Sequence, residues 1–502
     1  MSARGYAFLP DGTMLRGKSL AVHMDVDRED VWALRLRELN GLFAVVRNAD
    51  GFCAAAIDNS RLSPLYYRRG GDGVTAVADD AYSLLSYGDV LDGLGLAQYE
   101  ASGCTFDGHT LVSGVRQIRP GCYVTDRGSD IEYYSYGVMA QDARPLSFAA
   151  FDSLLGRVFG RLVRSVGGRQ IVVPLSGGQD SRLVLCRLKE LGLQNVVTYT
   201  VGGASSAEVA RARAVAAALG FEWHGVEIAA GDADEFVRAD EFLPYCRFIG
   251  GLVNFLWLYD YVAVAKLKAL GVLRPDAVFL PGHSADFNAG SHMRKGVIKE
   301  ASPERYVRSA ILYDIFEYDH EAGKEPKVMD VFDRGLSCGF APWSAFQNFE
   351  FKTRLPNNIN NSARVYEFLG YDVRLPFWDA EFLEAFRRMP FAQLADCRFY
   401  DSYVRESEFR KMGVDFGPEP PSAAYFRMGK FRKRVKAFLP DWLTRPRAMR
   451  QDDVGEHMLC APLREDLSMR GQYSSGRAPR SANEVMKDWY LMTVRNDLKR
   501  LE

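Results

Sequence analysis

Six consecutive residues of this sequence have the side chains best suited to binding a phosphorylated ligand: Ser176, Gly177, Gly178, Gln179, Asp180 and Ser181. They separate an apolar run that ends at Leu175 from a helical pattern over 182–188. Glycines at such a junction let the backbone approach a ligand, and the amides of the first helical turn carry partial positive charge. The serine hydroxyls add donors, and Asp180 is a potential Mg²⁺ ligand. These residues predict a phosphate-binding turn, and the non-functional alternative is a serine-capped helix after a glycine turn.

The segments that follow this turn predict the element that positions it. An apolar run over 196–201 predicts a second strand, and the stretch 206–220 predicts a helix that ends at Gly220. A third strand is expected over 223–228. Strands and helices that alternate in this way predict a parallel, doubly wound sheet, whose ligands bind at the carboxyl ends of the strands.

The first part of the chain has a different pattern. Short alternating runs over 41–46, 52–58 and 74–78 are joined by glycine-containing turns and predict a β-rich domain. A linker is expected between 135 and 147, before a helix over 148–166. We therefore divide the chain into domains at 1–142 and 143–502.

Composition excludes several classes of protein. The 502 residues are 47% hydrophobic and 12% aromatic, which is enough for a large core, and the net charge of -1 gives no attraction to nucleic acid or to an acidic membrane. Eight cysteines are scattered without a CxxC pair, so we expect reduced core thiols in a cytoplasmic protein. The N-terminus has no signal-peptide pattern, and the apolar stretch 252–265 is too short to span a bilayer.

Three motifs in order give the chain a resemblance to the class B asparagine synthetase family over nearly its full length. They are LSGGQDS (175–181), LPGHSADFNAG (280–290) and YDVRLPFWD (371–379). The runs beginning GLFAVV and VSGVRQ are similar to the family's glutaminase domain. The resemblance implies an α+β, Ntn-hydrolase-like β-rich sandwich, then an α/β PP-loop synthetase domain with a helical C-terminal part. The particular residues of the motifs are most similar to those of family members encoded with surface-polysaccharide enzymes. The resemblance implies that such members convert a sugar uronic acid to its uronamide in O-antigen or lipopolysaccharide synthesis.

The resemblance also implies a reaction and a set of binding residues. ATP and Mg²⁺ are the implied cofactors: a carboxylate attacks the α-phosphorus, pyrophosphate leaves, and ammonia then displaces AMP. The metal ligands would be Asp180 and Asp286. The residues implied to hold ATP are Leu175, Ser176, Gly177, Gly178, Asp180, Ser181, Thr200, Val201 and Gly282.

The first departure from the family lies at the N-terminus. Ser2 stands where the family has the cysteine that attacks glutamine, and the family's glutamine-binding loops are not visible. A terminal serine serves as a nucleophile in other amidohydrolases. Without the loops, however, we expect a degenerate domain that acts as a structural partner, and ammonia that comes from solution or from a separate enzyme.

Two further departures concern catalysis. His283 stands where asparagine synthetases have Glu, at a position that faces the acyl adenylate, so we expect it to accept a proton from the attacking amine, with Asp372 as its acidic neighbour. The alternative is a hydrogen-bonded structural histidine. In place of the family's C-terminal lysine stands Arg447, with Lys430 in reserve, and both lie in a basic run that is otherwise typical of a solvated surface.

The favoured function is an ATP-dependent, AMP-forming amidotransferase that acts on a small carboxylate, which could be nucleotide-linked or lipid-linked. Alternatives are an intramolecular amide-bond former of the β-lactam synthetase or lasso-peptide cyclase type and a true asparagine synthetase. An RNA-modifying PP-loop protein is disfavoured by the neutral charge, and a non-catalytic binding protein by the intact metal-ligand candidates. We expect no nucleic-acid partner and no transmembrane segment, and a homodimer is one expected assembly.

Overall fold

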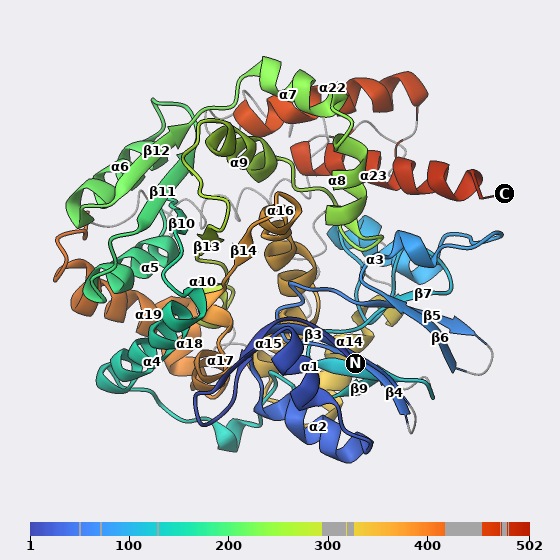
Figure 1. Cartoon of the computed structure of the whole chain (residues 1–502), viewed down its shortest axis with the longest axis horizontal. Coiled ribbons are helices and arrows are strands. Elements are labelled where there is room, and N and C mark those ends of the chain that lie inside the picture. The colour runs from blue at the N-terminus through green and yellow to red at the C-terminus, as the bar shows by residue number, and fades with distance from the viewer. Residues whose placement is uncertain are drawn as a thin grey trace, which may run out of the picture.

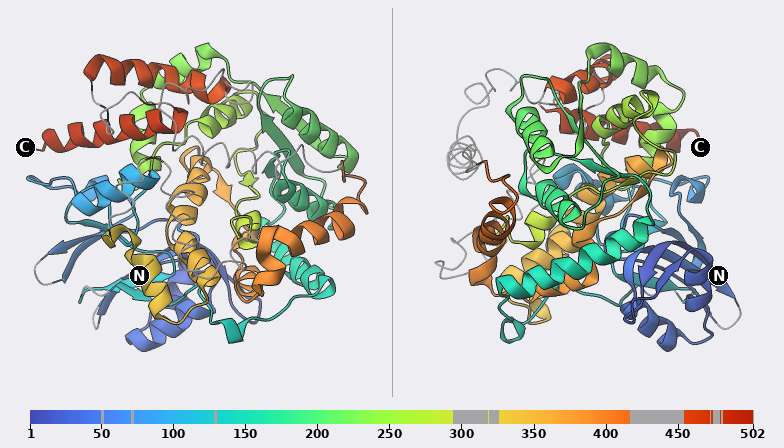
Figure 2. Two further views of the ribbon diagram at one scale, coloured as in Figure 1. Left: turned by 180° about the vertical axis from the view of Figure 1, so that it is seen from behind. Right: turned by 60° about the vertical axis from the view of Figure 1, so that its left-hand side comes forward.

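A computed structural model describes residues 1–49, 52–70, 73–127, 130–293, 318, 326–416, 454–471, 473, 479 and 481–501. The N-terminal strands gather at one side of the molecule and a parallel sheet at the other, with the last helices above both (Figure 1). A row of helices from the middle of the chain lies between the two sheet regions (Figure 2).

The parallel sheet confirms the predicted doubly wound arrangement. Its strand order is β12-β11-β10-β13-β14 and every pair is parallel. Their bounds are β10 Ile171–Pro174, β11 Val196–Val201, β12 Glu222–Val226, β13 Val278–Phe279 and β14 Asp372–Val373. The chain builds outward from β10 to β12 on one side and later resumes at β13 on the other. The strand order therefore reverses between β10 and β13, which is where open α/β sheets bind ligands.

Helices cover both faces of this sheet because alternate strand residues point to opposite sides. In β10, Ile171 and Val173 pack against one group of helices, and Val172 packs against a second group on the opposite face. The first group is α4 (Phe148–Val166), α5 (Gln179–Glu190), α6 (Ala207–Leu219), α17 (Ala380–Arg387) and α19 (Arg398–Tyr403). The second is α7 (Ala230–Arg238), α8 (Phe242–Gly250), α9 (Tyr259–Ala269), α16 (Arg364–Phe368), α22 (Val454–Arg470) and α23 (Ala482–Lys499).

Local sequence signals explain where the predicted helices begin and end. The helix expected over 148–166 has those bounds, with Ser147 accepting the Ala150 N–H as its N-cap. Helix α6 is capped by Ser206 at its start and ends at Gly220, whose φ of 74° is the left-handed conformation that glycine adopts without strain. The third strand, expected over 223–228, is shorter and begins one residue earlier.

The N-terminal part has two antiparallel sheets in the orders β2-β1-β3-β4-β8-β9 and β6-β5-β7. Their bounds are β1 Ser2–Phe8, β2 Met14–Arg16, β3 Asn40–Ala49, β4 Phe52–Ile57, β5 Tyr66–Gly70, β6 Gly73–Ala78, β7 Val115–Gln117, β8 Cys122–Thr125 and β9 Asp130–Glu132. Helices α1 (Lys18–Met24) and α2 (Glu29–Glu38) pack on one face of the larger sheet, and the smaller sheet packs on the other. The predicted β-rich domain is confirmed as helix, sheet and sheet layers, while the boundary at 142 stays a prediction.

The middle helices connect the two regions. Helix α15 (Pro342–Lys352), the π-helix η4 (Leu355–Asn360) and α16 follow one another, and we call this run the central rod. Its asparagines bond to both regions: Asn357 donates to the Thr105 carbonyl and Asn360 to that of Ser60, while Asn361 donates to that of Ile249. The rod is therefore fixed to both the N-terminal part and the helices of the parallel sheet.

Two compositional expectations can be compared with the structure. All eight cysteines are free thiols, but only six are buried, so the prediction of core thiols is wrong for the half-buried Cys53 and the exposed Cys338. In the part of the chain that the structure describes, no helix combines the length and apolar character needed to cross a membrane.

Candidate active site

The predicted phosphate-binding turn lies between β10 and α5, at the carboxyl edge of the sheet. Ser181 Oγ is 3.2 Å from the Ser176 amide and 3.1 Å from the Ser176 hydroxyl, which itself accepts the Gly178 N–H at 3.1 Å. The two serines thus fix the shape of the turn. The first amides of α5 have no side-chain cap, so they remain available as donors.

One donor of the turn is already engaged. The Gly177 N–H bonds to Glu208 Oε1 at 3.2 Å, and a side chain at Gly177 would lie 3.3 Å from the Glu208 Cγ. A carboxylate at this amide stands where an anionic phosphate oxygen would bind. The arrangement fits the expected phosphate site, because it accepts a negative group at a helix N-terminus.

A second turn, after β13, packs directly against the first. A Cβ on Gly282 would lie 2.7 Å from the Ser181 amide nitrogen and 2.9 Å from the Asp180 carbonyl carbon. Only glycine therefore allows the two turns to touch. Because β13 is the neighbour of β10, the two motifs meet at the reversal of strand order.

This contact brings together the two predicted metal ligands. The Asp286 amide donates to Asp180 Oδ2 at 3.1 Å, and the Tyr400 hydroxyl donates to Asp180 Oδ1 at 2.9 Å. Burial, followed by the negative charge of Asp286, raises the pKa of Asp180 well above its ordinary value. No described Lys, Arg or His forms an ion pair with either carboxylate, so a cation between them would relieve this repulsion.

The donor set fits Mg²⁺ rather than a metal held by protein alone. No group of three or more His, Cys, Asp or Glu residues suited to a metal lies within the described ranges. Mg²⁺ is usually bound by one or two carboxylates together with substrate phosphates and water. Asp180 and Asp286 would supply the two carboxylates.

The predicted nucleoside-binding positions lie along the same edge. Thr200 and Val201 end β11, beside β10, and the Thr200 hydroxyl is occupied: it donates to the Leu175 carbonyl at 2.7 Å and accepts from Trp223 at 3.0 Å. This side chain is therefore structural, and a contact of the ATP base with the backbone near Thr200 and Val201 stays a prediction.

His283 lies in the second turn, three residues before Asp286. Its Nδ1 is buried and has no hydrogen-bond partner in the described part of the chain. Burial lowers the pKa of His283 to about 4, although the nearby Asp286 charge acts in the opposite direction. The imidazole is therefore neutral at pH 7 and able to accept a proton.

The structure does not place Asp372 beside His283. Asp372 pairs in register with Val278, at the amino end of the neighbouring strand, whereas His283 follows the carboxyl end. Its carboxylate accepts from Arg16 and Arg169, each at 2.8 Å, and these charges overcome burial and lower its pKa. The predicted orienting role of Asp372 is wrong because Asp372 begins its strand, at the amino edge of the parallel sheet, whereas His283 lies at the carboxyl edge.

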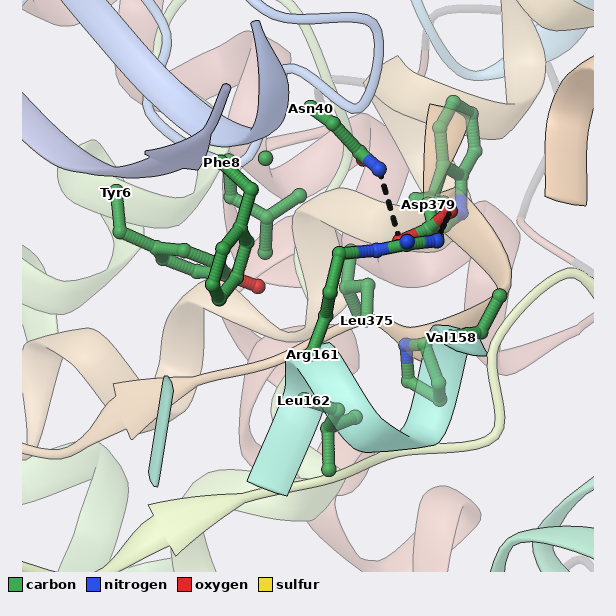
Figure 3. A pocket seen from close by; sticks show the side chains of 12 residues that line it. Tyr6, Phe8, Asn40, Val158, Arg161, Leu162, Leu375 and Asp379 are labelled. Carbon is green, nitrogen blue, oxygen red and sulfur yellow. Dashed lines mark hydrogen bonds and ion pairs between the residues drawn. The ribbon is translucent and has the colours of Figure 1, made fainter. Parts of the chain in front are cut away.

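The motif that contains Asp372 joins the N-terminal sheet to the parallel sheet. The Arg374 guanidinium lies 4.3 Å from the ring centre of Tyr6 in β1, and Asn40 in β3 donates to Asp379 at 3.0 Å. Figure 3 shows Asn40 and Arg161 converging on Asp379, where Arg161 makes two bonds of 2.8 Å. This motif therefore holds the two regions together.

Three other residues named from the sequence are Lys430, Arg447 and Ser2. Lys430 and Arg447 lie outside the described residues. Ser2 is the exposed first residue of β1, paired with Val46.

Sequence reasoning missed three side chains near the site. Tyr400 and Glu208 bond to the phosphate-binding turn from distant segments, and no local motif marks them. The third is His292, whose Nδ1 lies 2.8 Å from both carboxylate oxygens of Glu350. A histidine near the second motif was the available signal, whereas its partner could be found only from the structure.

Comparison with known proteins gives a family match for part of the chain. No curated protein matches the chain. Residues 161–398 match a family model described as asparagine synthase, and this segment includes both turns and the whole parallel sheet. The family forms amide bonds at the expense of ATP. The match thus supports placing this part of the chain in the asparagine synthase family.

Proposed function

We propose that this protein is an AMP-forming amide ligase that activates a carboxylate with ATP and transfers the acyl group to ammonia. The observation that supports it best is the meeting of the two turns at the strand-order reversal, with Gly282 against Asp180 and Ser181. Phosphate donors and two carboxylates thereby share one location.

The chemistry requires such a location. A carboxylate cannot expel oxide, so one of its oxygens attacks the α-phosphorus of ATP and the bond to pyrophosphate breaks. Ammonia then attacks the acyl carbon, the bond to AMP breaks, and one proton is released. The amides of the turn and Ser181 would hold the phosphates, and a Mg²⁺ ion at Asp180 and Asp286 would supply stabilisation of the departing negative charge.

His283 is our candidate for accepting the proton of the attacking amine. The neutral imidazole in the second turn has a buried Nδ1 without a described partner and lies close enough to Asp286 to experience its charge. Asp286, rather than Asp372, is the acid whose charge it experiences. Arg447 and Lys430 remain proposed pyrophosphate contacts from the resemblance alone.

The N-terminal part would act as a structural partner. Three residues of the third motif contact its first three strands: Asp372 meets Arg16, Arg374 meets Tyr6 and Asp379 meets Asn40. A domain tied in this way stabilises the parallel sheet whether or not it hydrolyses glutamine. We propose that nitrogen comes from free ammonia or a separate enzyme, in a cytoplasmic protein that acts on a sugar uronic acid of a surface polysaccharide.

The test is release of AMP and pyrophosphate with a panel of carboxylates that includes D-glucuronate, D-galacturonate and L-aspartate, each with ammonia. Asp180→Asn should abolish AMP formation, and Asp234→Asn, an exposed site on α7, should not change it. Activity with L-aspartate alone would indicate an asparagine synthetase. AMP formation at the normal rate in Asp180→Asn would refute the proposed site.

A further inference from the structure

The central rod carries several buried polar side chains, although most buried side chains of the protein are apolar. Gln347 and Glu350 lie three residues apart in α15, so they are neighbours on its surface, and Arg354 follows after a non-helical break at Thr353 (φ -126°, ψ -92°). Asn358 follows in the π-helix, a type of helix that is frequent at functional sites. With His292 bound to Glu350, these five residues make up what we call the acceptor cluster.

The cluster lies beside the second turn of the active site. The Ser291 amide donates to the Asp286 carbonyl at 3.0 Å, which places His292 next to α10 (Ala285–Asn288). The ring of Phe287 contacts that of His292, with 6.2 Å between their centres. Ser284, the residue after His283, bonds to Asn360 of the same rod at 3.4 Å. The rod therefore runs along the turn that carries His283 and Asp286.

Arg354 is the residue of this cluster that most needs a ligand. It is half-buried, and no described residue forms a hydrogen bond or ion pair with its guanidinium. Its charge acts on His292 and on the buried Cys104, so its guanidinium lies near both side chains. A half-buried arginine without a described acid partner is well suited to a carboxylate, which it binds through two parallel hydrogen bonds.

His292 adds a second positive group. Burial acts to lower its pKa, but the charge and hydrogen bond of Glu350 prevail and raise the pKa above its ordinary value. Glu350 is fully buried, whereas the His292 side chain is 38% exposed, so the imidazole is the accessible member of the pair.

The amides of the cluster are also unsatisfied. Both polar atoms of the Gln347 amide and the Asn358 Oδ1 are buried and lack partners in the described structure, at residue exposures of 1% and 5%. Each such atom destabilises the folded protein unless a ligand or an ordered water molecule bonds to it. Amides that both donate and accept are suited to hydroxyl groups.

We propose that the acceptor cluster binds the substrate, with Arg354 and His292 taking its carboxylate and the Gln347 and Asn358 amides taking its hydroxyl groups. This inference rests on the proposed function and names the substrate class: a polyhydroxylated carboxylic acid such as a uronic acid. An amino acid such as aspartate fits poorly, because the carboxylate of the cluster, Glu350, already accepts from His292 and cannot receive an ammonium group.

The test measures binding without ATP, by calorimetry, so it does not depend on catalysis. Wild-type protein should bind D-glucuronate more tightly than D-glucose or L-aspartate. Arg354→Gln should weaken glucuronate binding by about 10- to 100-fold, and Gln347→Leu by about 2- to 10-fold. Arg354→Lys keeps the charge but loses the two-point contact. Its affinity for glucuronate should therefore lie between those of wild type and Arg354→Gln, and it provides a test even if Arg354→Gln folds poorly. Arg28→Gln, at an exposed position, is the matched control.

Unchanged glucuronate affinity in Arg354→Gln, a wild-type preference for glucose or aspartate, or no glucuronate binding at all would each overturn the assignment. If the amides bind only water, Gln347→Leu should leave the affinity for glucuronate unchanged. That result would refute the proposed contact between the amides and the hydroxyl groups of the substrate. Glucuronate-dependent exchange of pyrophosphate into ATP is measured separately. If binding behaves as expected but exchange fails, the proposed reaction is wrong and the binding assignment stands.

Discussion

Replacing Asp286 with Asn should stabilise the protein without Mg²⁺ while removing its response to Mg²⁺. The Asp286 amide is 3.1 Å from Asp180 Oδ2, and burial, followed by the Asp286 charge, raises the pKa of Asp180, which is the direction expected for a buried carboxylate near a second one. Two unit charges about 4 Å apart interact by about 4 kcal/mol at an effective dielectric constant of about 20, and we expect only about 1 kcal/mol for this pair because Asp286 is exposed. The free energy of unfolding should rise by about that amount, and Tm by about 1–3 °C.

The assay is thermal unfolding of wild type and Asp286→Asn in EDTA, in Mg²⁺, and in Mg²⁺ with α,β-methylene-ATP, which resists cleavage. Wild type saturated at 100 times Kd should gain about 2.7 kcal/mol, and the variant should gain much less. Asp234→Asn should behave as wild type in every condition. A lower Tm in EDTA, or an unchanged response to Mg²⁺ with the analogue, would refute the idea of repelling carboxylates that a metal bridges.

The other predictions concern the two turns and the N-terminus. Gly282→Ala should lower the free energy of unfolding by about 1–3 kcal/mol and raise KM for ATP, because the added methyl meets backbone atoms at 2.7 and 2.9 Å. Gly93→Ala, whose methyl meets nothing within 4 Å, should change neither quantity. Equal behaviour of the two variants in denaturant unfolding would contradict the close approach of the two turns. His283→Ala should leave carboxylate-dependent ATP–pyrophosphate exchange intact and slow amide formation by about 10²- to 10⁴-fold, whereas equal loss of both steps would make His283 structural. Since the imidazolium cannot accept a proton and burial lowers the pKa of His283 to about 4, the rate of amide formation divided by the concentration of free NH₃ should decline only as pH falls toward that value. A decline of this corrected rate centred near 6.5 would exclude His283 as the base. Glutamine should not replace ammonia, because Ser2 provides no thiol, and steady glutamate release by the purified protein would show an active N-terminal domain.

Much of the parallel sheet and its first turn could be predicted from the sequence because their signals are local. The strand at 196–201, the helix at 148–166 and the caps at Ser206 and Gly220 depend on neighbouring residues, so pattern and structure agree. The contact of Asp180 with Asp286 was predictable through two motifs that each follow a parallel strand.

The site predictions that were wrong or missing concern residues whose positions depend on contacts between distant segments of the chain. Asp372 shares a motif with a strand of the same sheet, but its register puts it at the amino end, where Arg16 and Arg169 compete for it. The acceptor cluster was equally invisible, because His292 and Glu350 are 58 residues apart and meet only when the rod packs against α10. Sequence spacing carries no information on such contacts.

The central claim is that a carboxylate attacks the α-phosphorus of ATP at the turn that holds Asp180. The most direct measurement uses the best substrate of the carboxylate panel with ¹⁸O in its carboxylate, ammonia and Mg-ATP, followed by mass spectrometry of the nucleotide and phosphate products. One ¹⁸O per turnover should appear in AMP, with none in pyrophosphate and no product from Asp180→Asn. Label in inorganic phosphate with formation of ADP, or AMP without label, would contradict the account.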